Sequence, residues 1–378
     1  MSEIRVNNLS NESSTGGPTI SGITTFSGTN FFVPPVGNAA QRPDNPQKGA
    51  IRFNTDTKHL EYYKGDTIGW SDVEASNEEL DGGYRAVISI GQASSPVSYN
   101  NIIEYSTIST LGNATDFGDA GVTRDKLGAG ASRTRGIFVG GEGGGNVIEY
   151  VTISSTGNAV NFGDIGHGAE MRFSSAASDS TRTFFGGGYT SSTLYDTIEY
   201  ITTASTGNGV DFGNMTGGKN GPAALSSSTR GIFAGGSPAA GWGSDTNVIN
   251  YITISTTGNA ADFGDLSVAR SRVQGCSNST RGLVMGGVTP SASDVIDYIT
   301  TATLGNAVDF GNLAVVAERV ASAASPTRAL GFGGITPGAN LNTIQYVEIL
   351  TTGNTVDFGD MTNPAGGGAA CSNGHGGL

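Results

Sequence analysis

Acidic residues recur at one fixed place along the sequence, and a carboxylate is the first side chain to consider for chemistry. An aspartate, or once an asparagine, precedes the phenylalanine of a repeated D-F-G or N-F-G triplet: Asp116, Asn161, Asp211, Asp262, Asp309 and Asp357. Catalytic acids usually form one asymmetric set, so this repetition favours a role at turns or strand ends. One calcium ion per repeat is the alternative interpretation.

Other patterns that could carry chemistry are missing from the sequence. The histidines His59, His167 and His375 lie in separate segments without the spacing of metal ligands. The glycine run at 140–145 lacks a following helix and the Gly-Lys-Ser/Thr ending of a phosphate loop. No Ser/His/Asp arrangement is visible. We therefore expect a protein that is not an enzyme, with no catalytic residue, no metal and no cofactor.

The two cysteines, Cys276 and Cys371, occupy equivalent places in two repeats that are not adjacent, within G-C-S-N and A-C-S-N. A disulfide requires Cα atoms within about 7 Å of each other. Equivalent places in separate sheets should lie farther apart than that, so both residues are expected to be buried free thiols.

Four aromatic residues are the candidates for ligand binding, because each falls in a segment whose length varies between repeats: Tyr99, Tyr189, Tyr195 and Trp242. These segments run from a glycine doublet to the next Ile-x-Tyr, at 92–102, 142–147, 189–197, 237–248, 288–295 and 335–343. Loops on a rigid scaffold commonly carry recognition, and aromatic rings supply contact area. The alternative is that each ring packs on its own loop.

A sequence repeat must position all these residues. Six tyrosines are spaced by 45, 50, 51, 47 and 48 residues, and a phenylalanine follows each of them by twelve. The pairs are Tyr105 and Phe117, Tyr150 and Phe162, Tyr200 and Phe212, Tyr251 and Phe263, Tyr298 and Phe310, and Tyr346 and Phe358. This period is typical of one blade of a β-propeller.

Each repeat splits into four strand-like pieces, as at 249–255, 260–263, 273–277 and 281–285. Gly-Asn pairs within the repeats are expected to supply the positive φ of hairpin turns. Four-stranded units bury both faces only when stacked radially. The last repeat stops where its next apolar strand should begin, and residues 84–91 supply that strand. The sequence therefore predicts an all-β, six-bladed propeller over 84–378, closed by strand 84–91.

Composition agrees with short strands and excludes several classes of function. The chain of 378 residues has 60 glycines and only 14% charged residues, which is wrong for a helical protein. Its net charge of −13 argues against nucleic-acid binding. No secretory signal and no apolar run of membrane-spanning length occur in the sequence.

Residues 1–80 lie outside the repeat. We expect an extended attachment or oligomerisation segment at 1–48, followed by a small β-hairpin module and linker at 49–80. Its strands are predicted at 51–53, 60–63 and 68–70. So small a sheet needs another surface to bury its aromatics, and we expect a partner or a sister chain to supply it. The propeller's variable loops should share one face, with the chain entering at the other.

The repeat resembles the kelch repeat of β-propellers. The match comprises glycine doublets such as Gly140-Gly141 and Gly333-Gly334, and leading arginines at Arg124, Arg172, Arg270 and Arg319. Phenylalanine replaces the usual kelch tryptophan, and the third and sixth repeats lack the leading arginine.

A second resemblance covers nearly the whole chain. The segment SEIRVNNLSNESSTGGPTISGITTFSG, then FFVPPVG and GAIRFNTDTKHLEYYKGDTIGW, together with the IEYITI…GNA.DFG repeats, is similar to virion structural and tail-fibre-like proteins of tailed phages that infect marine cyanobacteria. This resemblance implies a virion component that is assembled in the host cytoplasm.

We accordingly expect a non-enzymatic phage structural protein of tail-fibre or receptor-binding type. Residues 1–80 would contact other virion proteins, and the propeller loops would face a host-surface glycan or protein, with no nucleic acid and no membrane insertion. A homo-oligomer is expected, with a trimer as the first guess. The alternatives are an architectural capsid or baseplate decoration protein, and a propeller enzyme acting on surface polysaccharide.

Overall fold

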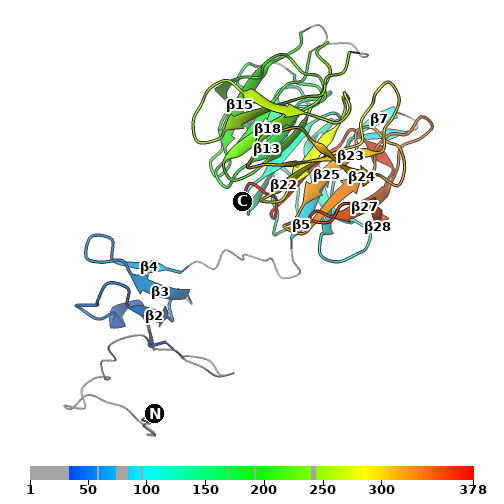
Figure 1. Ribbon diagram of the computed structural model, residues 1–378. Helices are drawn as coiled ribbons and strands as arrows, with labels where there is room; N and C mark the ends of the chain where they lie inside the picture. The colour runs from blue at the N-terminus through cyan, green and yellow to red at the C-terminus, as the bar shows by residue number, and fades with distance from the viewer. Residues whose placement is uncertain are drawn as a thin grey trace, which may run out of the picture. The chain divides into compact units, whose positions relative to one another are not determined.

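The structure, a computed structural model, describes residues 34–57, 59–73, 84–94, 97–168, 170–190, 193–239 and 244–378. The chain divides into two compact units, Met1–Glu78 and Glu79–Leu378, which we call the first and second units (Figure 1). The described residues contain β-strands and one short 3-10 helix, and no α-helix. The predicted all-β class is therefore confirmed.

The first unit contains a small four-stranded sheet. Its elements are β1 (Val36–Gly37), η1 (Ala39–Gln41), β2 (Ile51–Asn54), β3 (His59–Tyr63) and β4 (Trp70–Asp72). The strand order is β1-β2-β3-β4, with β1 parallel to β2 and the other pairs antiparallel. The strand predicted at 68–70 was placed too early, because Ile68 lies in a turn closed by its N–H on the carbonyl of Gly65.

The second unit contains five four-stranded antiparallel sheets in which strands adjacent in sequence are adjacent in space. These sheets comprise β9 (Gly128–Ala131), β10 (Arg135–Val139), β11 (Val147–Thr152) and β12 (Val160–Asp164); β13 (Ser175–Ser178), β14 (Arg182–Gly186), β15 (Thr197–Thr202) and β16 (Val210–Asn214); β17 (Ala223–Ser226), β18 (Arg230–Ala234), β19 (Val248–Thr253) and β20 (Ala261–Asp265); β21 (Gln274–Ser277), β22 (Arg281–Met285), β23 (Val295–Thr300) and β24 (Val308–Asn312); and β25 (Ala321–Ala324), β26 (Arg328–Phe332), β27 (Thr343–Glu348) and β28 (Val356–Asp360).

One further sheet combines strands from both ends of the second unit. β5 (Arg85–Ser89) lies between β30 (Ala369–Ser372) and β7 (Val97–Thr107), and β8 (Thr115–Arg124) pairs with the other edge of β7. β6 (Gln92–Ser94) and β29 (Ala365–Gly366) extend this sheet. In Figure 1 the cyan β5 is seen beside the orange and red strands of the last repeats.

The innermost strands are built from small residues. β9 reads GAGA, β13 SAAS and β25 ASAA, and each innermost strand contacts those of the neighbouring sheets. Small side chains allow this close approach, and together they line a narrow cavity of about 40 Å³. Both cysteines are buried free thiols, as predicted, and burial raises the pKa of each to about 12.

The core lies between neighbouring sheets. Phe162 and Ile148 of one sheet pack with Phe185 and Ile201 of the next, and the same type of cluster recurs around the unit. The D-F-G phenylalanines are only 2–3% exposed, and each meets the repeat tyrosine edge-on at 5.9–6.0 Å. Burying one such ring contributes about 1.5–3 kcal/mol.

An arginine at the start of the second strand of each sheet clamps that sheet to the one after it. Its guanidinium lies 4.5–5.1 Å from the centre of the repeat tyrosine ring. Its Nη1 donates to a backbone carbonyl of the neighbouring sheet's turn at 2.8–3.3 Å. The six clamping residues are Arg85, Arg135, Arg182, Arg230, Arg281 and Arg328.

The Gly-Asn pairs do not form the hairpin turns predicted for them, because the turn between β11 and β12 is closed before Gly157, by the N–H of Ser155 on the carbonyl of Thr152. Gly157 has a φ of 156°, but the side-chain Oδ1 of Asn158 accepts a hydrogen bond from the N–H of Asp119 in the preceding sheet, at 3.0 Å. The D-F-G glycine takes part in the same junction, since a Cβ at Gly118 would lie 2.6 Å from the carbonyl oxygen of Gly157. Equivalent Asn contacts of 3.0–3.1 Å occur in the other five sheets.

Candidate functional site

The residues that form the candidate site lie where the variable segments meet the connections into the innermost strands. Short antiparallel bridges join the two kinds of segment, as between Asp125 and Glu142 and between Arg172 and Tyr189. We call this end of the second unit the loop face. Its placement follows from the topology, because alternate connections of an antiparallel sheet emerge at the same end.

Six residues of the loop face line a second small cavity, next to the innermost strands, and each has a positive φ. They stand two residues before each innermost strand: Lys126 (60°), Phe173 (58°), Gly221 (65°), Arg272 (53°), Arg319 (58°) and Gly367 (76°). We call them the mouth ring. A non-glycine residue in this conformation costs on the order of 1–2 kcal/mol, so four of them at equivalent places mark a shared constraint.

Backbone hydrogen bonds between successive members supply that constraint. The N–H of Lys126 donates to the carbonyl of Gly367 at 2.7 Å, and the N–H of Phe173 donates to the carbonyl of Lys126 at 2.8 Å. The N–H of Arg319 reaches the carbonyl of Arg272 at 3.0 Å. The positive φ therefore turns each peptide toward the next member of the mouth ring. Sequence analysis missed the mouth ring, although the glycines at two of its six positions were a usable signal.

Charged side chains of alternating sign extend across the loop face from the mouth ring, and we call this series the charge chain. Arg172 bonds Glu170 at 3.1 Å and Glu142 at 2.9 Å, and Glu142 also pairs with the ammonium of Lys126. Lys126 Nζ in turn lies 3.6 Å from the carboxylate of Asp125. This half of the charge chain thus links two neighbouring sheets.

The second half of the charge chain continues on the far side of Asp125. Arg319 interacts electrostatically with Asp125, and its Nε lies 3.7 Å from Glu318. Glu318 then accepts a bond from Arg272 Nη1 at 2.5 Å. Four acids and four cations compensate each other here. All of these side chains except the buried Asp125 are partly exposed, as a surface that binds neutral polar groups requires.

Asp125 is the most perturbed acid of the loop face. Its side chain is fully buried, neither carboxylate oxygen has a hydrogen-bond partner, and Gly367 lies against it so closely that a Cβ there would be 2.1 Å from Oδ1. Burial raises the pKa of Asp125 to about 6, although Lys126 and Arg319 act against the rise. A substrate cannot reach this buried carboxyl group.

Two of the predicted binding residues meet at the charge chain. The ring of Tyr189 stacks on Phe173 with 6.2 Å between centroids, and Phe173 also receives the cations of Lys126 at 5.2 Å and Arg319 at 4.8 Å. Tyr99 lies beside Gly143, and burial followed by the charge of Glu142 raises its pKa. Both rings are half-buried.

The other two predicted residues are not part of this cluster. Tyr195 packs on His167, with 4.7 Å between ring centroids, and His167 Nδ1 lies 2.6 Å from Glu199. Burial alone would raise the pKa of Glu199, but bonds from His167 and the Gly166 N–H outweigh it and lower the pKa. Trp242 lies outside the described residues.

The leading arginines of the kelch resemblance fall into two groups. Arg124 and Arg270 are fully buried and pair with Glu149 at 2.7 Å and Asp297 at 2.8 Å. Arg172 and Arg319 do not occupy equivalent places, since they lie nearer to the innermost strands and face the charge chain. The third repeat carries a buried lysine at the place of Arg124, because Lys219 stands two residues before its mouth-ring glycine and donates to the carbonyl of Val248 at 2.7 Å.

The D-F-G acids are exposed at strand ends. Across the described ranges, no three His, Cys, Asp or Glu side chains group closely enough to hold a metal ion. No helix in the described part of the chain is long and apolar enough to cross a lipid bilayer. No protein-family model matches the sequence, and no curated protein matches it.

Proposed function

We propose that the six sheets of the second unit are the blades of a closed, kelch-like β-propeller. Support comes from contacts that run from each sheet to the next and return from the last to the first. Arg328 donates to the carbonyl of Ile108 at 3.3 Å, and the N–H of Asp360 donates to Asn113 at 3.0 Å. β5 beside β30 would complete the ring within one blade.

On this scaffold, we propose a non-enzymatic binding protein of a phage particle, anchored through residues 1–80 and turning its loop face toward a host-surface glycan or protein. The resemblance of the N-terminal segment and the repeats to tail-fibre-like proteins supports the assignment to a phage particle. The observation that carries the binding role is the meeting of Tyr99 and Tyr189 with the charge chain, on segments whose lengths differ between repeats.

The surface chemistry fits a glycan best. Sugar hydroxyl groups bind paired carboxylates and guanidinium groups in both hydrogen-bonding directions, and an aromatic ring covers the apolar face of a sugar. Arg172, Glu142 and the half-buried ring of Tyr189 offer these groups side by side. The charge chain is net neutral, so it would not repel an acidic glycan, whereas the rest of this acidic protein would.

A binding experiment tests the proposal. The labelled full chain is incubated with intact cyanobacterial cells and with their extracted surface polysaccharide, beside the variants Tyr189→Ala and Glu142→Gln. Val308→Ala, an exposed position at the start of β24 and away from the loop face, serves as the matched control. We expect the loop-face variants to lose at least tenfold in affinity while the control binds normally. No binding by the natural chain, or equal binding by all variants, would reject the proposal.

A further inference from the structure

The sheet of the first unit buries polar side chains and exposes apolar ones. On β2 and β3, Arg52, Asn54 and Glu61 are at most 5% exposed, while Ile51 is 52% exposed. Successive side chains of a strand point to opposite faces of the sheet. The pairing of Arg52 with Glu61 and of Ile51 with Tyr62 therefore separates a polar face from an apolar face.

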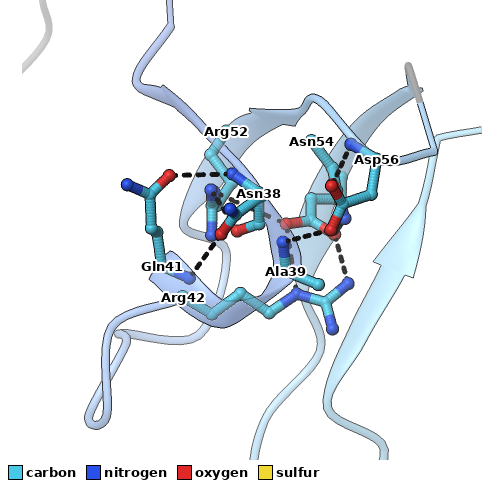
Figure 2. A network of polar contacts seen from close by, with 8 residues as sticks. Asn38, Ala39, Gln41, Arg42, Arg52, Asn54 and Asp56 are labelled. Atoms are coloured by element: carbon cyan, nitrogen blue, oxygen red, sulfur yellow. Dashed lines mark hydrogen bonds and ion pairs between the residues drawn. The ribbon is translucent and has the colours of Figure 1, made fainter.

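The polar face is closed by the chain itself (Figure 2). Arg42, which follows η1, reaches Glu61 with Nη2 at 2.6 Å and Nε at 3.3 Å, and Asn54 Nδ2 donates to the same carboxylate at 3.1 Å. Arg52 Nη2 donates to the carbonyl of Asn38 at 3.0 Å. The hydrogen bond from Arg42 lowers the pKa of Glu61 despite burial.

The η1 turn that covers this polar face is itself held in place. Asn38 and Gln41 cap it reciprocally, and the N–H of Ala39 donates to Asp56 at 2.9 Å. On the same face Tyr63 packs on Trp70 with 5.4 Å between centroids, and the Arg52 guanidinium lies 5.9 Å from the Trp70 ring. This side of the sheet thus needs no further partner.

The opposite side has no such cover within the described residues of the unit. Its members follow from the register, since Val36 pairs with Phe53 and Phe53 pairs with Leu60: Val36, Ile51, Phe53, Leu60 and Tyr62. We call them the apolar face. Val36 is 59% exposed, and the phenylalanine, leucine and tyrosine are only half-buried. A contiguous exposed patch of this kind is typical of an interaction surface.

Size and charge indicate what covers the apolar face. A chain of about 40 residues usually needs a disulfide, a metal or association to fold stably, and both cysteines of this protein lie in the second unit. Residues 34–73 contain five Lys/Arg and five Asp/Glu, whereas the whole chain has a net charge of −13. Copies of this neutral segment can approach one another without the repulsion that the rest of the chain would cause.

We propose that the apolar face of the first unit packs against the apolar face of other copies of this chain. The contact joins uncharged surfaces of the same kind, so it requires no complementary partner, and each buried ring or aliphatic side chain contributes through the area that it removes from water. The proposal deepens the anchoring role given above to residues 1–80, because it names the surface that assembles the oligomer. The trimer is the first stoichiometry to test.

The mass of the purified full chain in solution tests the proposal. Light scattering should give a multiple of the 38.4 kDa chain, and Ile51→Arg should return it to a single chain. Val308→Arg, exposed to 54% in the second unit, is the matched control and should keep the oligomer. A natural chain that is monomeric at micromolar concentration overturns the proposal, and so does an oligomer that persists in a folded Ile51→Arg variant.

A second variant covers the case in which Ile51→Arg fails to fold. Trp242→Phe makes Trp70 the sole tryptophan, so its fluorescence reports whether the first unit is folded. In that background Ile51→Cys should form an interchain disulfide on mild oxidation, because the proposal places this residue in the contact between copies. The natural cysteines are buried and should not react. Cross-linking no greater than that of Val308→Cys contradicts the proposal. Cell binding is measured separately, so loss of the oligomer and loss of the loop-face function are distinguishable.

Discussion

The β2–β3 pair of the first unit and the β10–β11 pair of the second unit are both antiparallel, but they bury opposite kinds of side chain. In β10, Ile137, Phe138 and Val139 are all fully buried, whereas in β2 and β3 the buried residues are Arg52, Asn54, Glu61 and Tyr63, three of them polar or charged. A sheet with a neighbour on each face has water on neither, so its strands can be apolar throughout. A sheet that covers its polar face with its own turn leaves its apolar face to be covered by another surface.

The largest effect expected from this difference concerns phenylalanine. Phe138→Ala should lower the free energy of unfolding of the second unit by about 3–5 kcal/mol, because the cavity lies between two sheets that cannot collapse onto it. Phe53→Ala, on the apolar face, should cost about 1 kcal/mol in a dissociated chain and more in the oligomer. Urea unfolding at several protein concentrations measures both. Equal, concentration-independent losses would remove the contrast between the units.

Close approach of neighbouring sheets is tested by two glycines at one junction. Gly264 has a φ of 145°, and a Cβ there would lie 2.4 Å from the carbonyl oxygen of Gly305. Gly305 has a φ of 151° but open space around it. Gly264→Ala should therefore cost about 3 kcal/mol, and Gly305→Ala only the backbone strain of about 1 kcal/mol. Similar thermal midpoints for the two variants would argue against this junction.

Two buried carboxyl groups give the units opposite responses to pH. The pKa of Glu61 is lowered, so its contribution to the first unit is present above the ordinary value and is lost as the pH falls through the folded value. The pKa of Asp125 is raised to about 6, so its stability contribution is present below the ordinary value and is lost as the pH rises through about 6.

Asp125→Asn tests the sign of this second response. At one pKa unit per 1.36 kcal/mol, the raised pKa corresponds to a loss of up to about 3 kcal/mol between pH 4 and pH 8. The stability difference between the variant and the natural chain should grow by that amount over the same range. Denaturant unfolding at each pH provides the measurement, and a difference that stays constant would show that Asp125 is not protonated in the fold.

The smallest effect is expected from the inter-sheet clamps. Arg182 lies 4.7 Å from the Tyr200 ring and donates to the carbonyl of Ile254 at 2.8 Å. Arg182→Ala should cost about 1–2 kcal/mol, the sum of one cation–π contact and one hydrogen bond. Arg182→Lys should recover less than half, because an ammonium group cannot stack and donate in the same geometry. Full recovery by lysine would assign the effect to charge alone.

The repeat made much of the second unit predictable. Tyr-to-Phe spacing located the outer two strands of each sheet. The sequence could not indicate contacts between repeats. From sequence alone Asn158 is interpreted as a turn residue, whereas in the structure it accepts a hydrogen bond from the N–H of Asp119 in the neighbouring sheet. The mouth ring was hidden for the same reason, because Lys126, Phe173, Arg272 and Arg319 share a backbone conformation and not a side-chain type.

The candidate site was predicted in part. Loop length and residue type identified Tyr99 and Tyr189, but the acids and cations of the charge chain that they meet come from five other connections. In the first unit, the sequence shows the alternation of Ile51, Arg52 and Phe53. Which face of the sheet is buried depends on the turn that carries Arg42 onto Glu61, and the sequence does not show that contact. A polar residue on a strand reads as solvent-facing unless its partner is known.

Hydrogen exchange at β30 tests the closed ring most directly. In the described residues the ladder partner of this strand is β5, more than 280 residues earlier in the sequence, in the register of Cys371 with Val87. A closed propeller predicts that the protected amides of Ala369–Ser372 exchange as slowly as those of the interior strands β10 and β14. Exchange of β30 at the rate of an unpaired strand, with β10 and β14 still protected, would contradict it.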